Sequence, residues 1–404
     1  MRTCHLVVAG IAAMSLTGLL NACAGDEGAV LVEHDASVPL TVDAAQADAA
    51  SDGDAAPCTD CEYFPEECSA DALCPNGPFG TNGGLDARTQ INAIVGRSER
   101  DVWVAGALGA VAHFDGVSWT RSDIGQQKSV HALWLRDSAE VAVVSLTELY
   151  ARGIEVPDAG APSAGGWLPV EQTVHSWDYF SWKRALVSAF SAPGAAWLWG
   201  ATENICESNG CAGNRTAGVW RVRASDSGTF ELSDAIDWEL CKEIWCGDMT
   251  SVHGSSANDL WAVGHAGAAL HITNAESDTP DVRAFNSQTS DSLHGVWAAS
   301  GSEAWAVGAK GIVRHYTGHS VTWDIVSDIP TVNDLHAIWG SSPSDIWAVG
   351  DAATVLHYDG KSWSRMKIAG LGTRRPKLTA VWMPSPGHVW IGGQGVVLSL
   401  GGKP

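Results

Sequence analysis

Basic residues are scarce in this chain. Its 404 residues include 24 Lys and Arg against 46 Asp and Glu, for a formal net charge of −22. More than half of this excess negative charge lies in residues 24–90, which contain 14 acidic residues and a single basic one, Arg88. A surface with this balance repels a phosphate backbone, which argues against nucleic acid as a partner.

A long hydrophobic run and the common catalytic motifs are also missing. The main apolar stretch, residues 6–20, is shorter than the roughly 20 residues of a transmembrane helix. The chain contains no G-x-S-x-G, no P-loop and no H-E-x-x-H. It therefore gives no sign of a serine hydrolase, a P-loop nucleotidase or a zinc protease, and neither a cofactor nor a metal is expected.

The apolar stretch instead predicts a secretory signal over residues 1–22, because Arg2 gives it a positive start and small residues end it. Its end, Leu20-Asn21-Ala22-Cys23, resembles a bacterial lipobox. The resemblance implies cleavage before Cys23 and acylation of that residue, and Ala24 resembles the outer-membrane sorting signal. The alternative is simple cleavage into the periplasm. We expect a cell-envelope protein, anchored by lipid to the outer membrane and either periplasmic or surface-exposed.

Residues 23–57 are rich in Ala and Asp and lack aromatic residues. Such a segment cannot bury a core, so it is expected to be a disordered, acidic tether without a recognition role.

Eight cysteines remain beyond the signal and the lipobox, in two groups. They are Cys58, Cys61, Cys68 and Cys74 in the segment 58–90, and Cys206, Cys211, Cys241 and Cys246 further on. An even number in an exported chain predicts disulfides. Zinc is the alternative, because Cys58-x-x-Cys61 has ligand-like spacing, but acidic neighbours and export favour disulfides. Local pairs Cys206–Cys211 and Cys241–Cys246 are expected.

The rest of the chain, residues 91–404, repeats one pattern seven times. The copies begin at 91–106, 130–145, 185–200, 249–264, 293–308, 335–350 and 378–393. The clearest, LHAIWGSSPSDIWAVG at 335–350, is two short apolar strands around a polar turn, and TVLHYD and SWSRMKI supply two more. Four strands in a period of about 40–45 residues are typical of a β-propeller. The predicted fold is all-β, a seven-bladed β-propeller of four-stranded blades, preceded by the signal peptide and the tether.

The seventh copy lacks a fourth strand, which would leave an unpaired edge. We expect residues somewhere in 62–90 to add the outer strand of this last blade.

Trp recurs at one position in six of the seven copies, and His recurs at another in four. The second strand carries Trp103, Trp197, Trp261, Trp305, Trp347 and Trp390, and the third carries His113, His271, His315 and His357. A residue repeated in every blade is most simply a requirement of the fold. We interpret the tryptophans as core and the histidines as packing and hydrogen-bonding residues, with ligand stacking as the alternative.

Positions that differ between copies are the better candidates for function. His131, His294 and His336 occupy the second position of the innermost strand in three blades. They line the expected channel and could converge on an anion or a metal, or simply form hydrogen bonds within the inner strands.

The segment 175–184 holds the densest mixture of aromatic and polar residues, including Trp177, Asp178, Tyr179 and Trp182. Such a mixture suits a sugar ring or a peptide. The alternative is an outer strand and turn packed on the third blade.

The repeat as a whole, S-x-D-I/V-W-A-V-G followed by H-Y-D-G-x-x-W, resembles the propellers of secreted bacterial proteins that carry BNR or Asp-box-like repeats. The resemblance covers residues 91–400 and implies the fold rather than a function.

Two functions follow as hypotheses. The first is a lipid-anchored, non-catalytic scaffold that binds an envelope protein, a glycan or a matrix component, and a purely structural envelope role is its simpler form. The second is a glycan hydrolase or lyase at the channel mouth, which needs paired acids. The nearest candidates are Asp178, Asp237, Glu239 and Asp248.

Overall fold

The computed structural model describes residues 60–80, 84–156, 160–174, 184–205, 217–225 and 229–403. Residues 58–404 form one compact unit, which contains all of these residues. The expected signal, tether and lipidated Cys23 lie outside the described residues. So do Cys58, Cys206 and Cys211, and the candidates Trp177, Asp178, Tyr179 and Trp182.

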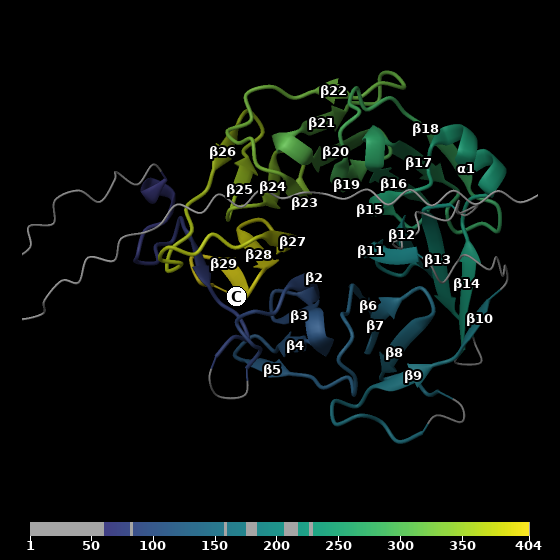
Figure 1. Ribbon diagram of the computed structural model, residues 1–404, viewed down its shortest axis with the longest axis horizontal. Helices are drawn as coiled ribbons and strands as arrows, with labels where there is room; N and C mark the ends of the chain where they lie inside the picture. Colours follow the sequence, from purple (N-terminus) through teal and green to yellow (C-terminus); the bar gives the residue numbers. More distant parts are fainter. Residues whose placement is uncertain are drawn as a thin grey trace, which may run out of the picture. The chain divides into compact units, whose positions relative to one another are not determined.

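Seven sheets stand around a central axis, as the repeat predicts (Figure 1). Blade 1 is β2 (Ile91–Ser98), β3 (Asp101–Gly106), β4 (Val111–Phe114) and β5 (Trp119–Arg121). Blade 2 is β6 (Ala132–Arg136), β7 (Ala139–Ser145), β8 (Glu148–Arg152) and β9 (Leu168–Val170). Blade 3 is β11 (Arg184–Phe190), β12 (Trp197–Asn204), β13 (Val219–Ala224) and β14 (Phe230–Asp234), with β10 (Gln172–Val174) added outside.

The later blades follow the same order. Blade 4 is β15 (Met249–Ser256), β16 (Asp259–Gly264), β17 (Ala269–Thr273) and β18 (Asp281–Ala284). Blade 5 is β19 (Leu293–Ser300), β20 (Glu303–Gly308), β21 (Val313–Tyr316) and β22 (Asp324–Ile325). Blade 6 is β23 (Leu335–Ser342), β24 (Asp345–Gly350), β25 (Val355–Tyr358) and β26 (Trp363–Arg365). Blade 7 is β27 (Leu378–Ser385), β28 (His388–Gly393) and β29 (Val396–Leu400), with β1 (Leu73–Pro75) outside.

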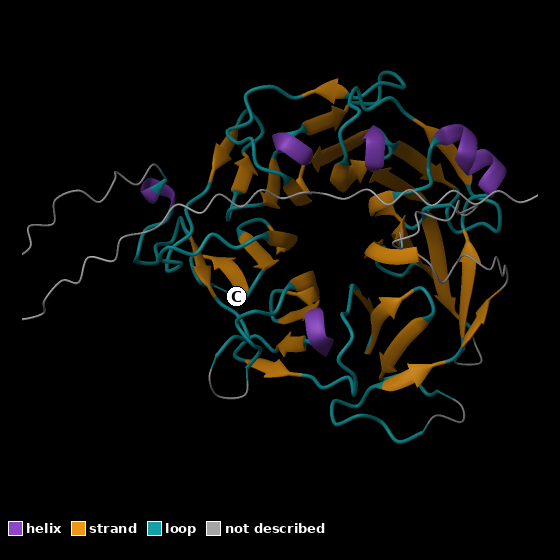
Figure 2. Cartoon of the chain, viewed as in Figure 1, coloured by secondary structure: helices purple, strands orange, loops and turns teal. Residues whose placement is uncertain are grey.

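Helical segments are short and lie between strands (Figure 2). The helix α1 (Trp238–Ile244) joins blades 3 and 4, and the 3-10 turns are η1 (Cys61–Tyr63), η2 (Ala107–Gly109), η4 (His265–Gly267) and η5 (Ala309–Gly311). No helix in the described part of the chain has both the length and the hydropathy of a membrane span.

The repeated Trp and His form one unit inside a blade. In blade 6, Trp347 pairs across the strands with His357, and both rings bond Asp345, through Trp347 Nε1 at 3.0 Å and His357 Nε2 at 2.9 Å. Blade 1 repeats the arrangement with its own Asp, Trp and His, whose two rings stack 4.2 Å apart. The repeated residues therefore serve packing and hydrogen bonding within the fold.

β1 supplies the outer strand of blade 7 from the segment in which the sequence predicts it. It runs antiparallel to β29, with Leu73 opposite Leu400. The Leu73 amide also donates to the Lys367 carbonyl at 2.9 Å, which ties β1 to the chain leaving blade 6. The ring is thus closed by a strand that precedes blade 1 and pairs with the last strand of blade 7, so β29 is not left unpaired.

Disulfides reinforce two of the connections. Cys68 is bonded to Cys74 just before β1, and Cys241 to Cys246 at the end of α1, the second as the sequence predicts. Cys61 is disulfide-bonded as well.

Blade 3 departs from the expected four strands because it has five. After leaving blade 2, the chain passes the outer edge of blade 3, where β10 pairs in parallel with β14. The segment near residue 170 is therefore in part an extra outer strand.

Candidate functional site

The inner strands of all seven blades surround a channel of about 160 Å³. Near one end of these strands, polar side chains at the second repeat position form a ring, which we call the polar ring. Its members are Asn92, His131, Thr250, His294, His336 and Thr379. The sequence repeat places Leu186 at this position in blade 3, but the strand register places Val187 there, because the bulge of β11 falls at Val187 as that of β2 falls at Asn92. Val187 is apolar and lines the channel, so the polar ring is interrupted in blade 3.

Four members of the polar ring bind the next blade around the axis. Asn92 donates to the carbonyl of Val130, and Thr250 to that of Leu293. The remaining two contacts are His294 Nδ1 to the Leu335 carbonyl at 3.0 Å and Thr379 Oγ1 to the Ile91 carbonyl at 2.5 Å. The inner strand of each blade has backbone groups on its free edge that no neighbouring strand pairs with. These side chains provide hydrogen bonds to some of those carbonyl groups. For His294, hydrogen bonding within the fold is thus observed.

The other two histidines of the ring differ from His294. His336 Nε2 bonds Asp351 Oδ1 at 2.7 Å, and its ring stacks on that of His294 at 5.4 Å. Burial lowers the pKa of His336 and of His131. Within the described residues, the His131 side chain has no hydrogen-bond partner, and no group of three or more His, Cys, Asp or Glu is arranged to hold a metal.

Deeper in the channel, aromatic side chains from three blades meet, and we call them the aromatic floor. The ring of His253 lies 4.3 Å from that of Phe190 and 4.8 Å from that of Trp339. Trp339 of blade 6 also packs against the buried apolar residues of blades 6, 7 and 1. Because it contacts His253 of blade 4 as well, its side chain extends toward the axis of the ring. His253 Nδ1 accepts the Ala298 amide at 3.1 Å, and burial lowers its pKa to about 3.

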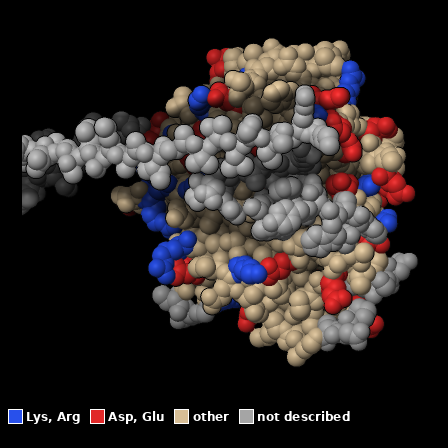
Figure 3. Space-filling model, turned by 45° about the vertical axis from the view of Figure 1, so that its right-hand side comes forward, with Lys and Arg blue, Asp and Glu red and all other residues tan. Residues whose placement is uncertain are grey.

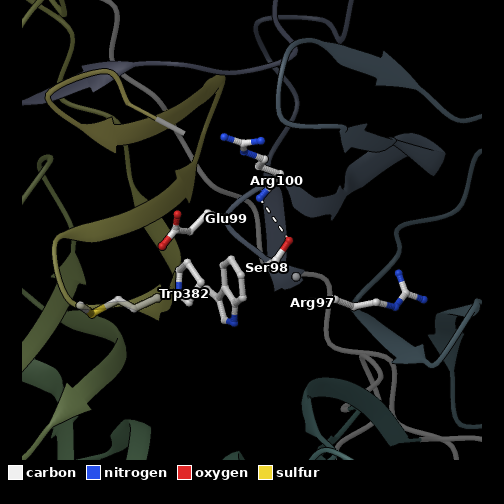
Figure 4. Close-up of a pocket in the computed structure, with 8 residues that line it drawn as sticks. Arg97, Ser98, Glu99, Arg100 and Trp382 are labelled. Carbon is white, nitrogen blue, oxygen red and sulfur yellow. Dashed lines mark hydrogen bonds between the residues drawn. The ribbon is translucent and has the colours of Figure 1, made fainter.

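A second recess, the seam cleft, lies where blade 7 meets blade 1 (Figure 4). Its volume is about 540 Å³, and it is lined by Gly96, Arg97, Ser98, Glu99, Arg100, Trp382, Met383 and Pro384. The cleft is at the turns that end β2 and β27, away from the polar ring.

The floor of the seam cleft is apolar and fixed. The Trp382 ring packs directly over Gly96, where an added Cβ would come within 2.5 Å of it. Trp382 belongs to the buried cluster between blades 7 and 1, whereas the side chain of Met383 is buried on the other face, between blades 6 and 7. Only a glycine leaves room for this contact, so Trp382 is held in place by the neighbouring blade.

Charged side chains form the wall of the cleft. Arg97 bonds Asp101 at 3.1 Å and Glu140 at 2.9 Å, and Glu99 accepts the Ser385 hydroxyl at 2.6 Å. The aliphatic part of Arg100 packs over Gly116, while its guanidinium has no ion pair among the described residues. The cleft therefore offers one anchored carboxylate and one exposed guanidinium above an apolar base.

The acids considered for catalysis serve structural roles where they are described. Asp237 caps the N-terminus of α1, and Glu239 pairs with Lys242 at 2.6 Å. Asp248 accepts the Asn204 amide at 2.7 Å and lies 3.8 Å from the buried Arg184. On the face seen in Figure 3, acidic and basic side chains are interspersed.

The seam cleft and the aromatic floor are absent from the sequence-based candidates. A signal for the cleft exists, because the first copy has Arg97-Ser98-Glu99-Arg100 in a turn where copies three to seven have small or uncharged residues, such as Ser341-Ser342-Pro343-Ser344. The sequence also contains a signal for the aromatic floor, because the fifth position of the repeat is Trp or His in five copies.

No protein-family model matches the chain, and no curated protein matches it. Several solved structures share its fold. YCF48 bound to a D1 peptide is 15% identical with a TM-score of 0.52, over 82% of this chain and 97% of that one. The WD40 β-propeller domain of Doa1 is 12% identical with a TM-score of 0.54, over 81% and 96%. YCF48 from Cyanidioschyzon merolae is 13% identical with a TM-score of 0.55, over 78% and 96%. At these identities the likeness establishes the propeller fold.

Proposed function

We propose that this protein is a lipid-anchored, non-catalytic propeller of the cell envelope, and that it binds a segment of a partner protein in the seam cleft. The observation that carries the proposal is the cleft itself. Its volume of about 540 Å³ falls within the roughly 300–1,000 Å³ of ordinary ligand sites. An apolar base with a few fixed polar groups is the usual composition of such sites.

The chemistry of the cleft fits a peptide. The Trp382 ring, which packs against blade 1, provides the base for an apolar side chain. Glu99 can accept backbone or side-chain N–H groups, and the exposed Arg100 guanidinium can donate to carbonyl or carboxylate oxygens. The first copy has three charged residues in this turn, more than any other copy, and a function is expected where copies differ. A similar fold in a protein described as bound to a peptide supports the same class of ligand.

The lipid anchor is proposed from the lipobox resemblance at Cys23. Each buried methylene contributes about 0.8 kcal/mol, so several acyl chains would hold the protein firmly on the membrane. Replacement of Cys23 by Ser should abolish incorporation of labelled palmitate and release the protein from the membrane fraction. Retention of the Cys23→Ser protein with the membrane would contradict this anchor.

The binding site is best tested by site-specific photo-crosslinking in intact cells. A photo-reactive residue would replace Ser98, with Ser256 as the matched control, because both are exposed at the same position of equivalent turns. We expect the same protein adduct at Ser98 in repeated experiments, identified by mass spectrometry, and none at Ser256. Equal labelling at both positions would contradict the seam cleft as the site.

Charge reversal then tests the residue roles with the partner so identified. Arg100→Glu should weaken binding by about 10- to 100-fold, because a hydrogen bond to a charged group contributes roughly 1.5–3 kcal/mol. Arg121→Glu, on the outer strand of the same blade, is the matched control and should leave the affinity unchanged. A glycan recovered in place of a protein would refute the peptide proposal and favour a glycan ligand.

A further inference from the structure

The channel offers a second binding site, separate from the seam cleft and of a different kind. We propose that it is a socket for one aromatic or branched aliphatic side chain of a peptide, whose backbone lies across the polar ring. The size of the cavity is the first observation. At about 160 Å³ it is below the roughly 300 Å³ at which sites for whole small molecules begin. It is too small to enclose a disaccharide or a nucleotide, and a single side chain is of the right scale.

The walls of the channel are uncharged. Among the described residues that line it, none carries a carboxylate, an ammonium or a guanidinium group. A buried ion without a partner is costly, so Lys, Arg, Asp and Glu side chains are poor guests here. The nearest acid to the ring, Asp351, is already bonded to His336.

Below the polar ring, small residues leave the channel open. The lining there includes Ala93, Ala132, Gly295, Ala337 and Ala380. Val187 of blade 3, at the level of the polar ring, is 39% exposed and leaves apolar surface for a guest to cover. Covering such surface contributes about 25 cal/mol per Å², and this favours an apolar guest.

The aromatic floor fixes the depth of the socket. It lies at the fifth repeat position and the polar ring at the second, so the two levels are separated by about 10 Å at the rise of a strand. Phe190, Trp339 and the neutral His253 offer ring faces and edges, with which aromatic side chains pack favourably. A Phe, Tyr or Leu side chain that enters from the ring points toward this floor, and the aromatic side chains extend further toward it than Leu.

The polar ring suits the backbone of the same peptide. His131 has no side-chain partner among the described residues. His294 uses only Nδ1, as a donor, so its Nε2 remains an acceptor in the neutral ring. The ring can therefore accept an N–H group and donate to a carbonyl group at the mouth. An apolar anchor beneath a polar rim is the common form of an energetic hot spot.

The test uses capped peptides Ac-Gly-Gly-Xaa-Gly-Gly-NH2, with Phe, Leu, Lys or Glu at Xaa, and saturation-transfer NMR at millimolar concentration. We expect the Phe and Leu peptides to bind at least tenfold more tightly than the Lys and Glu peptides. Equal affinities, a preference for a charged residue, or no binding of any peptide would overturn the proposal.

Two variants locate the binding. Ala337→Leu and Ala93→Leu fill the channel from blades 6 and 1 and should each abolish the signal of the Phe peptide, whereas Ala284→Leu on the exposed strand β18 should not. Thermal midpoints check the fold of each variant, and binding that persists in both filled variants would overturn the proposal. Arg100→Glu in the seam cleft should leave this signal unchanged, so the two sites are tested independently.

Discussion

His253 should make the stability of the propeller depend on pH in a way that one substitution removes. Its imidazole is buried between blades 4 and 5, where Nδ1 accepts the Ala298 amide at 3.1 Å. An acceptor nitrogen must stay unprotonated, and burial accordingly lowers the pKa of His253 from 6.5 to about 3. Protonation in the folded state would break this bond and place a charge among the rings of Phe190 and Trp339.

The sign of the effect follows from proton binding. Below pH 6.5 the unfolded chain takes up a proton on this histidine, while the folded protein does not until about pH 3. The stabilisation is therefore complete above pH 6.5 and is lost as the pH falls toward 3. One proton corresponds to about 1.4 kcal/mol per pH unit, so this residue should account for a loss of roughly 3 kcal/mol between pH 7 and pH 4.

The comparison protein is His253→Asn, whose side-chain oxygen can accept the same amide but does not titrate. Urea unfolding at pH 7, 6, 5 and 4 gives the free energy of unfolding of both proteins. The difference between them should change by about 1.4 kcal/mol per pH unit below pH 6.5. Burial also lowers the pKa of His131, His315 and His336, but they are present in both proteins and cancel in the difference. Parallel pH profiles would refute the reasoning.

Three further substitutions test how the blades are held together, each by urea unfolding at pH 7. Trp347→Ala should lower the free energy of unfolding by about 3–5 kcal/mol, because it empties a buried site, and a loss below about 1 kcal/mol would contradict its place in the core. Gly340→Ala should cost about 1–3 kcal/mol, since the new Cβ would lie 2.7 Å from the Trp297 ring. Gly247→Ala is its control, because nothing lies within 4 Å of a Cβ there. Cys241→Ser should cost about 2 kcal/mol through the opened loop, whereas an unchanged urea midpoint would show that α1 needs no covalent closure.

The repeat was sufficient to predict the propeller because its periodicity is local. Each copy alternates apolar residues over a few positions, and Trp347 with His357 shows why both residues recur, since one Asp holds both rings. The closing strand was also predictable, because an unpaired edge in blade 7 requires a partner. These inferences need only one blade and its immediate neighbour.

The recesses were harder to predict because they require the ring to be assembled. The aromatic floor joins Phe190, His253 and Trp339 from three different blades, and no window of sequence contains them together. In the seam cleft, Trp382 of the last blade packs over Gly96 of the first blade, and these residues are far apart in the sequence. The fifth strand of blade 3 was hard to predict for a similar reason, since β10 pairs with β14, which follows much later in the chain.

The polar ring shows how a repeated position divides between fold and function. In four blades its side chain bonds a carbonyl of the next blade, and that bond satisfies the free inner edge. In blade 4 two more side chains do the same, where Ser251 accepts the Val296 amide and His253 the Ala298 amide. Such residues are fixed by the ring and cannot turn toward a ligand without breaking it. The His131 side chain makes no such hydrogen bond among the described residues, so it is the member of the polar ring best placed to contact a guest.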